Sequence, residues 1–269
     1  MKDSIPNRRR IPLLTKLRLA GMALRESGIR WFVLFGTYYV SSALAGRAFE
    51  AMENLRRNRG VPGLNSAKLN KAIWEAWDWS GGGAEFGAGE WKESVIRCLM
   101  EPHLPARGNT LEIGPGSGRW TEALIDRSAR FIGVDISETC VQVCRERFAA
   151  RNHATFVLGS GRDLAGIDSG SIDALWSFDV FVHINIAEVR GYAAEFARVL
   201  RPGGRGAIHH GAVAGAAGGW RSDLTQQALL DLLGQNGLRV LHSFAEWQDG
   251  GTRQRLDFED GFTVFEKPG

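Results

Sequence analysis

Cysteine is scarce in this chain of 269 residues, which contains only Cys98, Cys140 and Cys144. Three cysteines are too few for a scaffold held together by disulfides. Cys140 and Cys144 form a C-x3-C pair, and no second pair completes a zinc site of that kind. We therefore expect a reducing, cytoplasmic compartment and no structural metal.

Long apolar runs are missing as well. The most apolar stretch, residues 31–46, has 16 positions without a charge between Arg30 and Arg47, and it includes Thr37 and Ser41. A membrane span needs about 20 apolar residues, and the run begins too late for a signal peptide. The pattern argues against both and indicates an interfacial helix with basic flanks.

The charge of the chain is nearly balanced, at a formal +3, but this value averages two unlike segments. Residues 1–60 carry 12 Lys and Arg against 4 Asp and Glu, a formal charge of +8, whereas residues 61–269 carry 21 against 26, a charge of −5. A basic segment predicts an anionic partner, such as the inner face of a membrane. The alternative is that residues 1–60 pack on the body or on a second copy of the chain.

Residues 1–60 are predicted to form a helical arm, because Leu13, Leu17 and Leu24 recur at helical spacing. Basic residues accompany them, including Arg8, Arg9, Arg10, Arg18 and Arg25. Residues 61–105 follow as a tryptophan-rich cap with Trp74, Trp77, Trp79 and Trp91, a glycine-rich loop over 81–89, and a helix over 90–103.

Residues 106–269 alternate short apolar runs with amphipathic stretches, which is typical of a parallel sheet covered by helices. The predicted strands are 110–113, 130–134, 154–158, 173–178, 206–210, 238–246 and 256–266, and the predicted helices are 119–127, 138–150, 186–200 and 222–235. No helix separates the last two strands, so we expect the final strand to be antiparallel. The predicted fold is an open α/β sheet of seven strands, mostly parallel, with helices on both faces.

The first strand of this sheet ends in a glycine-rich turn, Glu112-Ile113-Gly114-Pro115-Gly116-Ser117-Gly118. Glycines there let the backbone approach a ligand, and open parallel sheets bind ligands at this edge. The dinucleotide fingerprint would need a small residue where Arg119 stands, and the lysine of a P-loop is missing. The turn therefore disfavours a nicotinamide cofactor and a nucleoside triphosphate.

The second strand ends at Asp135, 21 residues after Gly114. A carboxylate in this place can accept hydrogen bonds from both ribose hydroxyls of a nucleoside. The alternative is that Asp135 caps the next helix, although Ser137 can supply that cap.

With these motifs the chain resembles the class I S-adenosylmethionine-dependent methyltransferases over about residues 88–267. The resemblance rests on the turn LEIGPGSG (111–118), Asp135, the loop GSGRDL (159–164), the segment SFDVFVHI (177–184) and the helix-to-strand turn RVLRPGG (198–204). It implies S-adenosylmethionine as the cofactor. The residues that it places around the cofactor are Glu112, Gly114, Pro115, Gly116, Gly118, Arg119, Trp120, Asp135, Ile136, Ser160, Gly161, Arg162, Ser177, Phe178 and Asp179.

Two missing sequence motifs narrow the possible classes of methyl acceptor. The Asp/Asn-Pro-Pro-aromatic run of amino-methylating DNA enzymes and the Pro-Cys nucleophile of carbon-methylating ones are both missing, and the body is acidic. We therefore expect no nucleic acid substrate. The leading hypothesis is methyl transfer to a hydroxyl oxygen of a small metabolite or of a glycan, which can be lipid-linked.

A hydroxyl acceptor needs a general base, and His183, His209 and His210 fall at predicted strand ends. Because side chains alternate along a strand, only one of His209 and His210 can point into the cleft. Asp179 would orient a histidine or anchor a substrate hydroxyl. The alternative is that these histidines make structural hydrogen bonds; a metal held by Asp179 and His183 has no supporting signature.

Trp79, Trp91, Trp220 and Arg221 are the predicted substrate-binding residues. The aromatic faces suit a sugar or another ring-shaped acceptor, and Arg221 suits an anionic group on it. The glycine-rich stretch 211–219 is predicted to form a mobile flap over the cleft. Two other functions stay open. One is N-methylation of a small amine, which needs no base, and the other is a scaffold protein that binds the cofactor without catalysis.

Overall fold

A computed structural model describes residues 13–82 and 89–269 of the chain. The chain divides into two compact units, Met1–Leu55 and Arg56–Gly269. Arg8, Arg9 and Arg10 of the predicted arm and most of the predicted loop over 81–89 lie outside the described residues.

The first unit consists of most of helix α1 (Leu13–Arg59), which is broken at Gly28, where φ is 77° and ψ is 164°. Only glycine adopts such a conformation readily, so the break separates two helices. Among the described residues, no helix is long and apolar enough to cross a membrane.

The second unit is built on a seven-stranded sheet in the order β3-β2-β1-β4-β5-β9-β6. Its strands are β1 (Asn109–Ile113), β2 (Arg130–Asp135), β3 (Ala154–Leu158), β4 (Ile172–Phe181), β5 (Leu200–Gly211), β6 (Arg239–Phe244) and β9 (Asp260–Glu266). Strands β1 to β5 are parallel, and β9 is antiparallel to both β5 and β6. The predicted fold class, with its antiparallel last strand, is confirmed.

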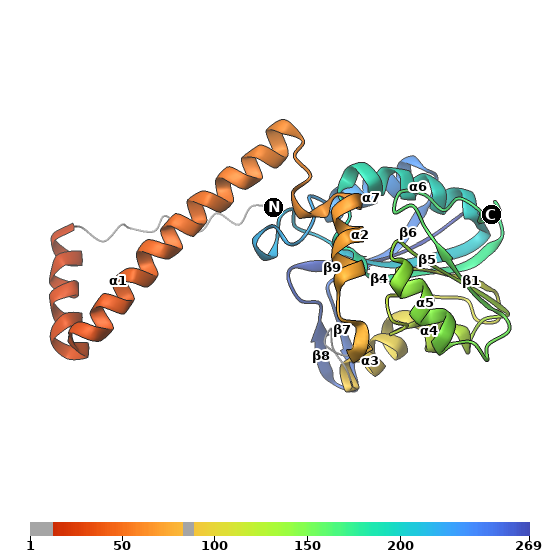
Figure 1. The fold of residues 1–269 in the computed structure, drawn as a ribbon, viewed down its shortest axis with the longest axis horizontal. Coiled ribbons are helices and arrows are strands. Elements are labelled where there is room, and N and C mark those ends of the chain that lie inside the picture. Colours follow the sequence, from red (N-terminus) through yellow and green to blue (C-terminus); the bar gives the residue numbers. More distant parts are fainter. Residues whose placement is uncertain (1–12, 83–88) are drawn as a thin grey trace. The chain divides into compact units, whose positions relative to one another are not determined.

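Helices cover both faces of the sheet, as Figure 1 shows. On one face α6 (Ile186–Val199) and α7 (Gln226–Gln235) contribute Phe196 and Leu233 to a core with Leu175. On the other face α3 (Glu90–Val95), α4 (Thr121–Ile125) and α5 (Glu138–Arg147) pack against Trp176 and Phe262. The strands are therefore buried on both sides, which explains their nearly continuous apolar sequence.

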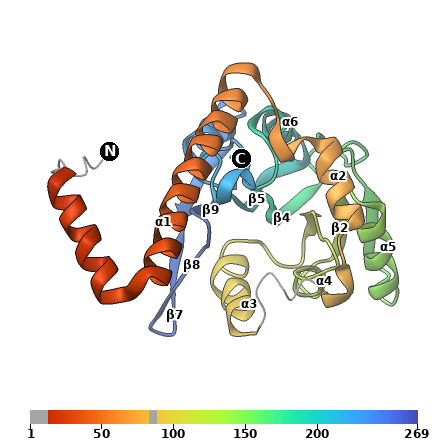
Figure 2. The same cartoon turned by 60° about the vertical axis from the view of Figure 1, so that its left-hand side comes forward.

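The cap belongs to the same unit as the sheet. It comprises a 3-10 turn (Gly63–Asn65), α2 (Ala67–Ala76), a second 3-10 turn (Trp79–Gly81), α3 and a π-helical turn (Ile96–Met100). Glu75 of α2 accepts hydrogen bonds from the Glu138 and Thr139 backbone amides at the start of α5. Figure 2 shows α2 beside α5.

Several elements differ from the sequence prediction: β5 begins six residues earlier than predicted, β9 begins four residues later, and one hairpin was not predicted. A hairpin of β7 (Glu246–Asp249) and β8 (Thr252–Arg255), turning at Gly250 and Gly251, lies between the last two sheet strands. It packs on α3, because Trp247 donates a hydrogen bond to Ser94 Oγ at 2.9 Å. Helix α7 begins four residues later than predicted, because Thr225 Oγ1 caps it by accepting the Ala228 N–H.

Gly206 and Gly234 differ in how closely neighbouring atoms approach them. A Cβ at Gly206 in β5 would lie 2.3 Å from the Phe265 ring, whereas a Cβ at Gly234 in α7 would meet nothing within 4 Å. We expect Gly206→Ala to lower the free energy of unfolding by about 1–3 kcal/mol, because an overpacked core must shift. Gly234→Ala should raise it by about 0.5–1 kcal/mol through helix propensity. Urea denaturation measures both, and equal effects would contradict this packing.

Candidate active site

One cavity of about 590 Å³ lies at the carboxyl edge of the sheet, within the usual size range of small-molecule sites. The turn after β1, the end of β2, the end of β4, the cap and the loop before β9 all line it. Parallel strands end at the same edge, so residues far apart in the sequence meet here.

The glycine turn after β1 forms the floor of the cavity. Gly114 has a φ of 70°, and a Cβ there would lie 2.2 Å from Val180; Gly116 has a φ of 57°, and a Cβ there would lie 3.1 Å from the Trp79 ring. Both positions therefore require glycine for their backbone conformation and for the close approach of a neighbour.

Asp135 lines the cavity at the end of β2. Its carboxylate accepts the Gly116 N–H at 3.0 Å and the Ser137 N–H at 2.9 Å, and burial raises its pKa to about 6. Ser137 Oγ caps α5 by accepting the Cys140 N–H. The cap is thus supplied without Asp135, whose oxygens retain further lone pairs for a ligand.

Glu112 lies beneath the turn rather than in the cavity lining. Thr121 Oγ1 donates to its Oε2 at 2.6 Å, and Oε1 has no hydrogen-bond partner among the described residues. Burial raises the pKa of this carboxyl to about 8. A protonated carboxyl costs less to bury than a carboxylate, so Glu112 is mainly neutral at pH 7.

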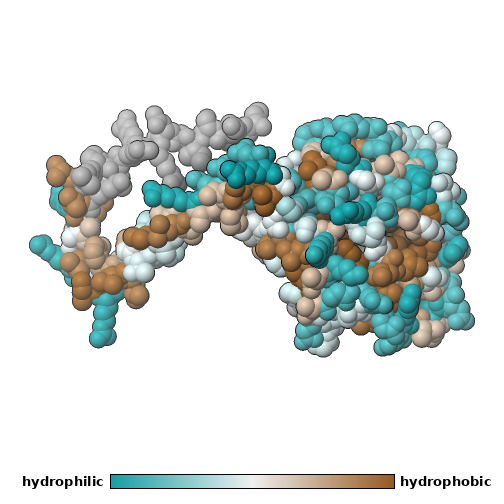
Figure 3. Space-filling model, turned by 45° about the horizontal axis from the view of Figure 1, so that its top comes forward, coloured by the Kyte–Doolittle hydropathy of each residue, from teal (hydrophilic) through white to brown (hydrophobic). Residues whose placement is uncertain are grey.

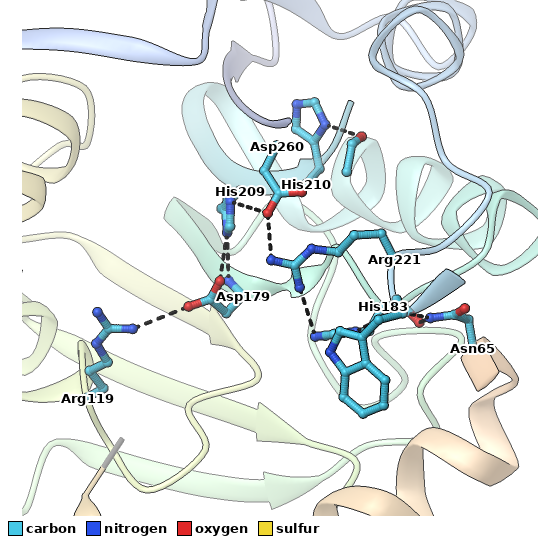
Figure 4. A network of polar contacts seen from close by, with 10 residues as sticks. Asn65, Arg119, Asp179, His183, His209, His210, Arg221 and Asp260 are labelled. Carbon is cyan, nitrogen blue, oxygen red and sulfur yellow. Dashed lines mark hydrogen bonds and ion pairs between the residues drawn. The ribbon is translucent and has the colours of Figure 1, made fainter. Parts of the chain in front are cut away.

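A chain of charged side chains crosses one wall of the cavity, as Figure 4 shows. Asp179 lies 3.3 Å from Arg119 Nη1 through one oxygen and 3.1 Å from His209 Nδ1 through the other. His209 Nε2 lies 3.3 Å from Asp260, and Arg221 Nη2 donates to Asp260 at 2.8 Å. Two acids, two arginines and one histidine therefore form a single buried network.

Asp179 is the member of this network with the most exposed side chain, at 32%, against 4% for His209 and 1% for Asp260. It has a φ of 61° and lies at a register shift between β4 and β5. A non-glycine residue in the left-handed region at a bulge commonly marks a functional position. The bulge also lets the Asp179 backbone N–H donate to His209 Nδ1 at 3.1 Å.

The pKa values of His209 and Asp179 shift in opposite directions, upward for His209 and downward for Asp179. Burial opposes the charged ring of His209, but the Asp179 and Asp260 carboxylates at its two nitrogens raise the pKa above 6.5. Burial alone would raise the pKa of Asp179, but His209, Arg119 and Arg221 lower it below 3.8. A strengthened base next to an ionised carboxylate is an arrangement suited to proton transfer.

His183 also lines the cavity, between the rings of Trp74 and Trp220. Its Nδ1 lies 3.3 Å from the Trp220 carbonyl oxygen and its Nε2 lies 3.4 Å from Arg221 Nη1. Burial, reinforced by Arg221, lowers its pKa to about 4. The ring is therefore neutral at pH 7, with both nitrogens engaged by neighbours.

His210 points away from the cavity, so His209 is the histidine of that pair in the site. His210 is fully buried, with Nε2 2.8 Å from Thr263 Oγ1 and Nδ1 2.9 Å from the Gly211 carbonyl oxygen. Burial lowers its pKa to about 4. The alternation of side chains along β5 separates the two histidines.

Most of the other predicted residues line the cavity. Ten of the residues predicted to bind the cofactor line the cavity: Gly114, Pro115, Gly116, Arg119, Trp120, Asp135, Ile136, Gly161, Phe178 and Asp179. The other five are not in its lining: Glu112, Gly118, Ser160, Arg162 and Ser177. Ser160 instead accepts the Arg162 and Asp163 amides, and Ser177 donates to the Ile113 carbonyl. The four predicted substrate residues, Trp79, Trp91, Trp220 and Arg221, all contribute to the lining.

The residues that join the cap to the His183 and Arg221 side of the cavity were not among the predicted site residues. Asn70 donates to the His183 carbonyl at 2.7 Å, and Asn65 donates to the Trp220 carbonyl at 3.2 Å. Arg56 reaches Asn185 at 3.1 Å and the Arg221 carbonyl at 3.3 Å. Asp260 was missed as well, because no local motif distinguishes it from other acids near a strand.

The cavity has features that suit a nucleoside-bearing cofactor: a glycine turn that allows close approach, a carboxylate at the end of the second strand that can accept hydrogen bonds, and aromatic faces. The guanidinium carbon of Arg119 lies 4.4 Å from the centre of the Trp120 ring and 5.4 Å from the centre of the Trp91 ring. Among the described residues, no group of three or more His, Cys, Asp or Glu is arranged to hold a metal ion.

The buried Glu112 carboxyl makes stability depend on pH. Its pKa is raised from 4.5 to about 8 on folding, so its stabilising contribution is complete below about pH 4.5 and is lost as the pH rises through 8. We expect Glu112→Gln, which keeps an acceptor for Thr121, to remove this decline. Urea denaturation of both proteins from pH 4.5 to 8 measures it, and parallel profiles would contradict the assignment.

Residues 111–208 match the family described as "Methyltransferase domain". A demethylmenaquinone methyltransferase of Tropheryma whipplei is 32% identical over 115 residues, which are 43% of this chain and 45% of that protein. The chain thus spans less than half the length of this curated relative.

Two solved structures share the fold. A methyltransferase solved with the Haloferax volcanii activator Trm112 has a TM-score of 0.58 and 19% identity, covering 73% of this chain and 98% of that chain. The geranyl diphosphate C-methyltransferase of Streptomyces coelicolor, in complex with Mg2+, geranyl diphosphate and S-adenosyl-L-homocysteine, has a TM-score of 0.55 and 14% identity, covering 75% and 97%. The sequence match identifies residues 111–208 as a methyltransferase domain, and the two solved structures share the fold that surrounds it.

Proposed function

We propose that the protein transfers a methyl group from S-adenosylmethionine to a hydroxyl oxygen of a small hydroxylated metabolite or of a glycan. The observation that carries this proposal is the Asp179–His209 pair, which shares one cavity with the glycine turn and Asp135. A hydroxyl acceptor must lose a proton as it attacks, and this pair can take that proton.

The residues of the turn and of β2 would hold the cofactor. Gly114 and Gly116 leave room for it against the backbone, and the Asp135 carboxylate suits two ribose hydroxyls. The faces of Trp91 and Phe178 suit a sulfonium cation. When bound, S-adenosylmethionine supplies a methyl group that is activated by its positively charged sulfur.

Asp179 would receive the acceptor proton, because its side chain lines the cavity and is the most exposed of the network. His209 Nδ1 lies 3.1 Å away and accepts a hydrogen bond from the Asp179 backbone, so it carries a lone pair. The proton of the hydroxyl would pass to Asp179 and then to Nδ1, which would give up its hydrogen bond to the Asp179 backbone, while the new carbon–oxygen bond would replace the carbon–sulfur bond of the cofactor. Asp260 stabilises the resulting imidazolium from the Nε2 side.

The cavity walls indicate the kind of acceptor. Trp74, Trp79, Trp220 and Phe258 present rings to the cavity, and Arg221 adds a buried cation. Such walls orient a planar or ring-shaped molecule and exclude water, and orientation alone contributes roughly 7–11 kcal/mol to a reaction of this kind. The name of the Tropheryma whipplei relative, a demethylmenaquinone methyltransferase, also supports a small-molecule acceptor.

Substitution of the proposed base tests the mechanism. We expect His209→Gln to lower kcat by about 10²–10⁴-fold on a hydroxyl acceptor, while cofactor affinity changes little. In the wild type, kcat should rise with pH through the pKa of His209, which lies above 6.5, because only the neutral ring accepts a proton. His242→Gln, in β6 and outside the cavity lining, is the matched control. A His209→Gln enzyme with the wild-type pH profile would contradict the mechanism.

A panel of acceptors tests the function itself. With labelled S-adenosylmethionine, we expect transfer to one or more glycans or phenols. If the enzyme methylates only amines, and single substitutions of His183, His209 and His210 each leave that activity intact, the protein is an N-methyltransferase instead. Cofactor binding without transfer to any acceptor would favour the scaffold. Asp135→Ala should abolish cofactor binding in each case, which calorimetry measures independently of catalysis.

A further inference from the structure

Large apolar side chains are exposed along α1, most of which belongs to the first unit. The exposed fractions reach 70% for Leu34, 66% for Tyr38 and 62% for Val40. In Figure 3 apolar side chains occur along this helix with hydrophilic ones among them. Contiguous exposed apolar surface on a protein marks a site of interaction with another molecule.

The charge-free run over residues 31–46 is adapted to apolar surroundings despite its polar residues. Thr37 Oγ1 donates to the Val33 carbonyl at 2.9 Å, and Ser41 Oγ donates to the Thr37 carbonyl at 2.8 Å. Both hydroxyl protons are therefore satisfied within the helix. This lowers the cost of moving the side chains out of water.

The residues around the run favour a lipid surface over a second copy of the chain. Arg25, Arg30 and Arg47 are exposed on either side of it, and residues 1–60 carry a formal charge of +8. Trp31 and Tyr38, also exposed, are residue types that concentrate at the boundary between bilayer and water. A second copy would bring like charges together, whereas anionic headgroups complement them.

We propose that α1 docks the protein on an anionic lipid surface, with residues 31–46 in the interfacial region and the flanking arginines on the headgroups. At about 1.5 Å per residue the run is about 24 Å long, short of a hydrocarbon core of about 30 Å. The helix therefore lies at the surface and does not cross it. Docking through α1 does not depend on which methyl acceptor the second unit uses.

Flotation of the full chain with lipid vesicles tests the proposal. We expect binding to vesicles of phosphatidylglycerol and phosphatidylcholine, weaker binding to phosphatidylcholine alone, and release by salt. Replacing Arg25, Arg30 and Arg47 by Gln should weaken binding about fivefold for each charge and about 100-fold together. Leu34→Gln with Val40→Gln should weaken binding to both kinds of vesicle.

Arg190→Gln and Leu158→Gln are matched controls, because both residues are exposed on the second unit. They should float like the wild type, and urea denaturation of every variant shows whether the body remains folded. A full chain that fails to float with anionic vesicles overturns the proposal, as does a triple arginine variant that floats like the wild type. An oligomer by light scattering, dispersed by the Leu34 and Val40 substitutions, without vesicle binding also overturns it and assigns the surface to a second copy.

Discussion

The parallel pairing of β1 with β4 and of β4 with β5 is the constraint on which the site depends. Glu112 is in register with Trp176, and Ser177 with Ile208, so the residues that follow each of these positions emerge at one edge. The glycine turn, Asp179 and His209 meet only because of this alignment. A shift of one residue in any of these strands would turn the side chains to the opposite face.

The bulge in β4 modifies this regular pattern at one point. The register with β5 shifts between Ser177 and Phe181, and Asp179 takes a positive φ within that interval. The strand thereby presents a carboxylate to the cavity and a backbone N–H to His209. Local strain of this kind persists where the surrounding structure fixes it, and here strands on both sides of β4 do so.

Burying several charges together is costly unless they compensate one another. In this wall Arg119 faces Asp179, Arg221 faces Asp260, and His209 lies between the two acids. Glu112 has no such partner among the residues that the structure describes, and burial raises its pKa to about 8, which favours the protonated carboxyl. The cap contributes to the same wall, since Asn65 and Asn70 hold backbone carbonyls next to His183.

Local sequence was sufficient for much of the fold. A short apolar run located β3 at residues 154–158, and the missing helix between the last strands indicated the antiparallel β9. The glycine spacing and Asp135 pointed to the cofactor edge, because both signals lie within one strand-turn-helix unit. The β7–β8 hairpin was missed, since its two strands have only four residues each and carry charged side chains.

The sequence by itself determined the order of the seven sheet strands and of the helices between them, the glycine turn and the basic, apolar character of residues 1–60, because each depends on residues close together in the chain. Only the tertiary structure decided that His209 rather than His210 faces the cavity, that Arg221 and Asp260 complete its wall, and that Arg56, Asn65 and Asn70 brace it. These contacts join residues between 30 and 165 positions apart in the sequence. Such pairs are set by strand register and by the packing of the cap, which no local pattern encodes.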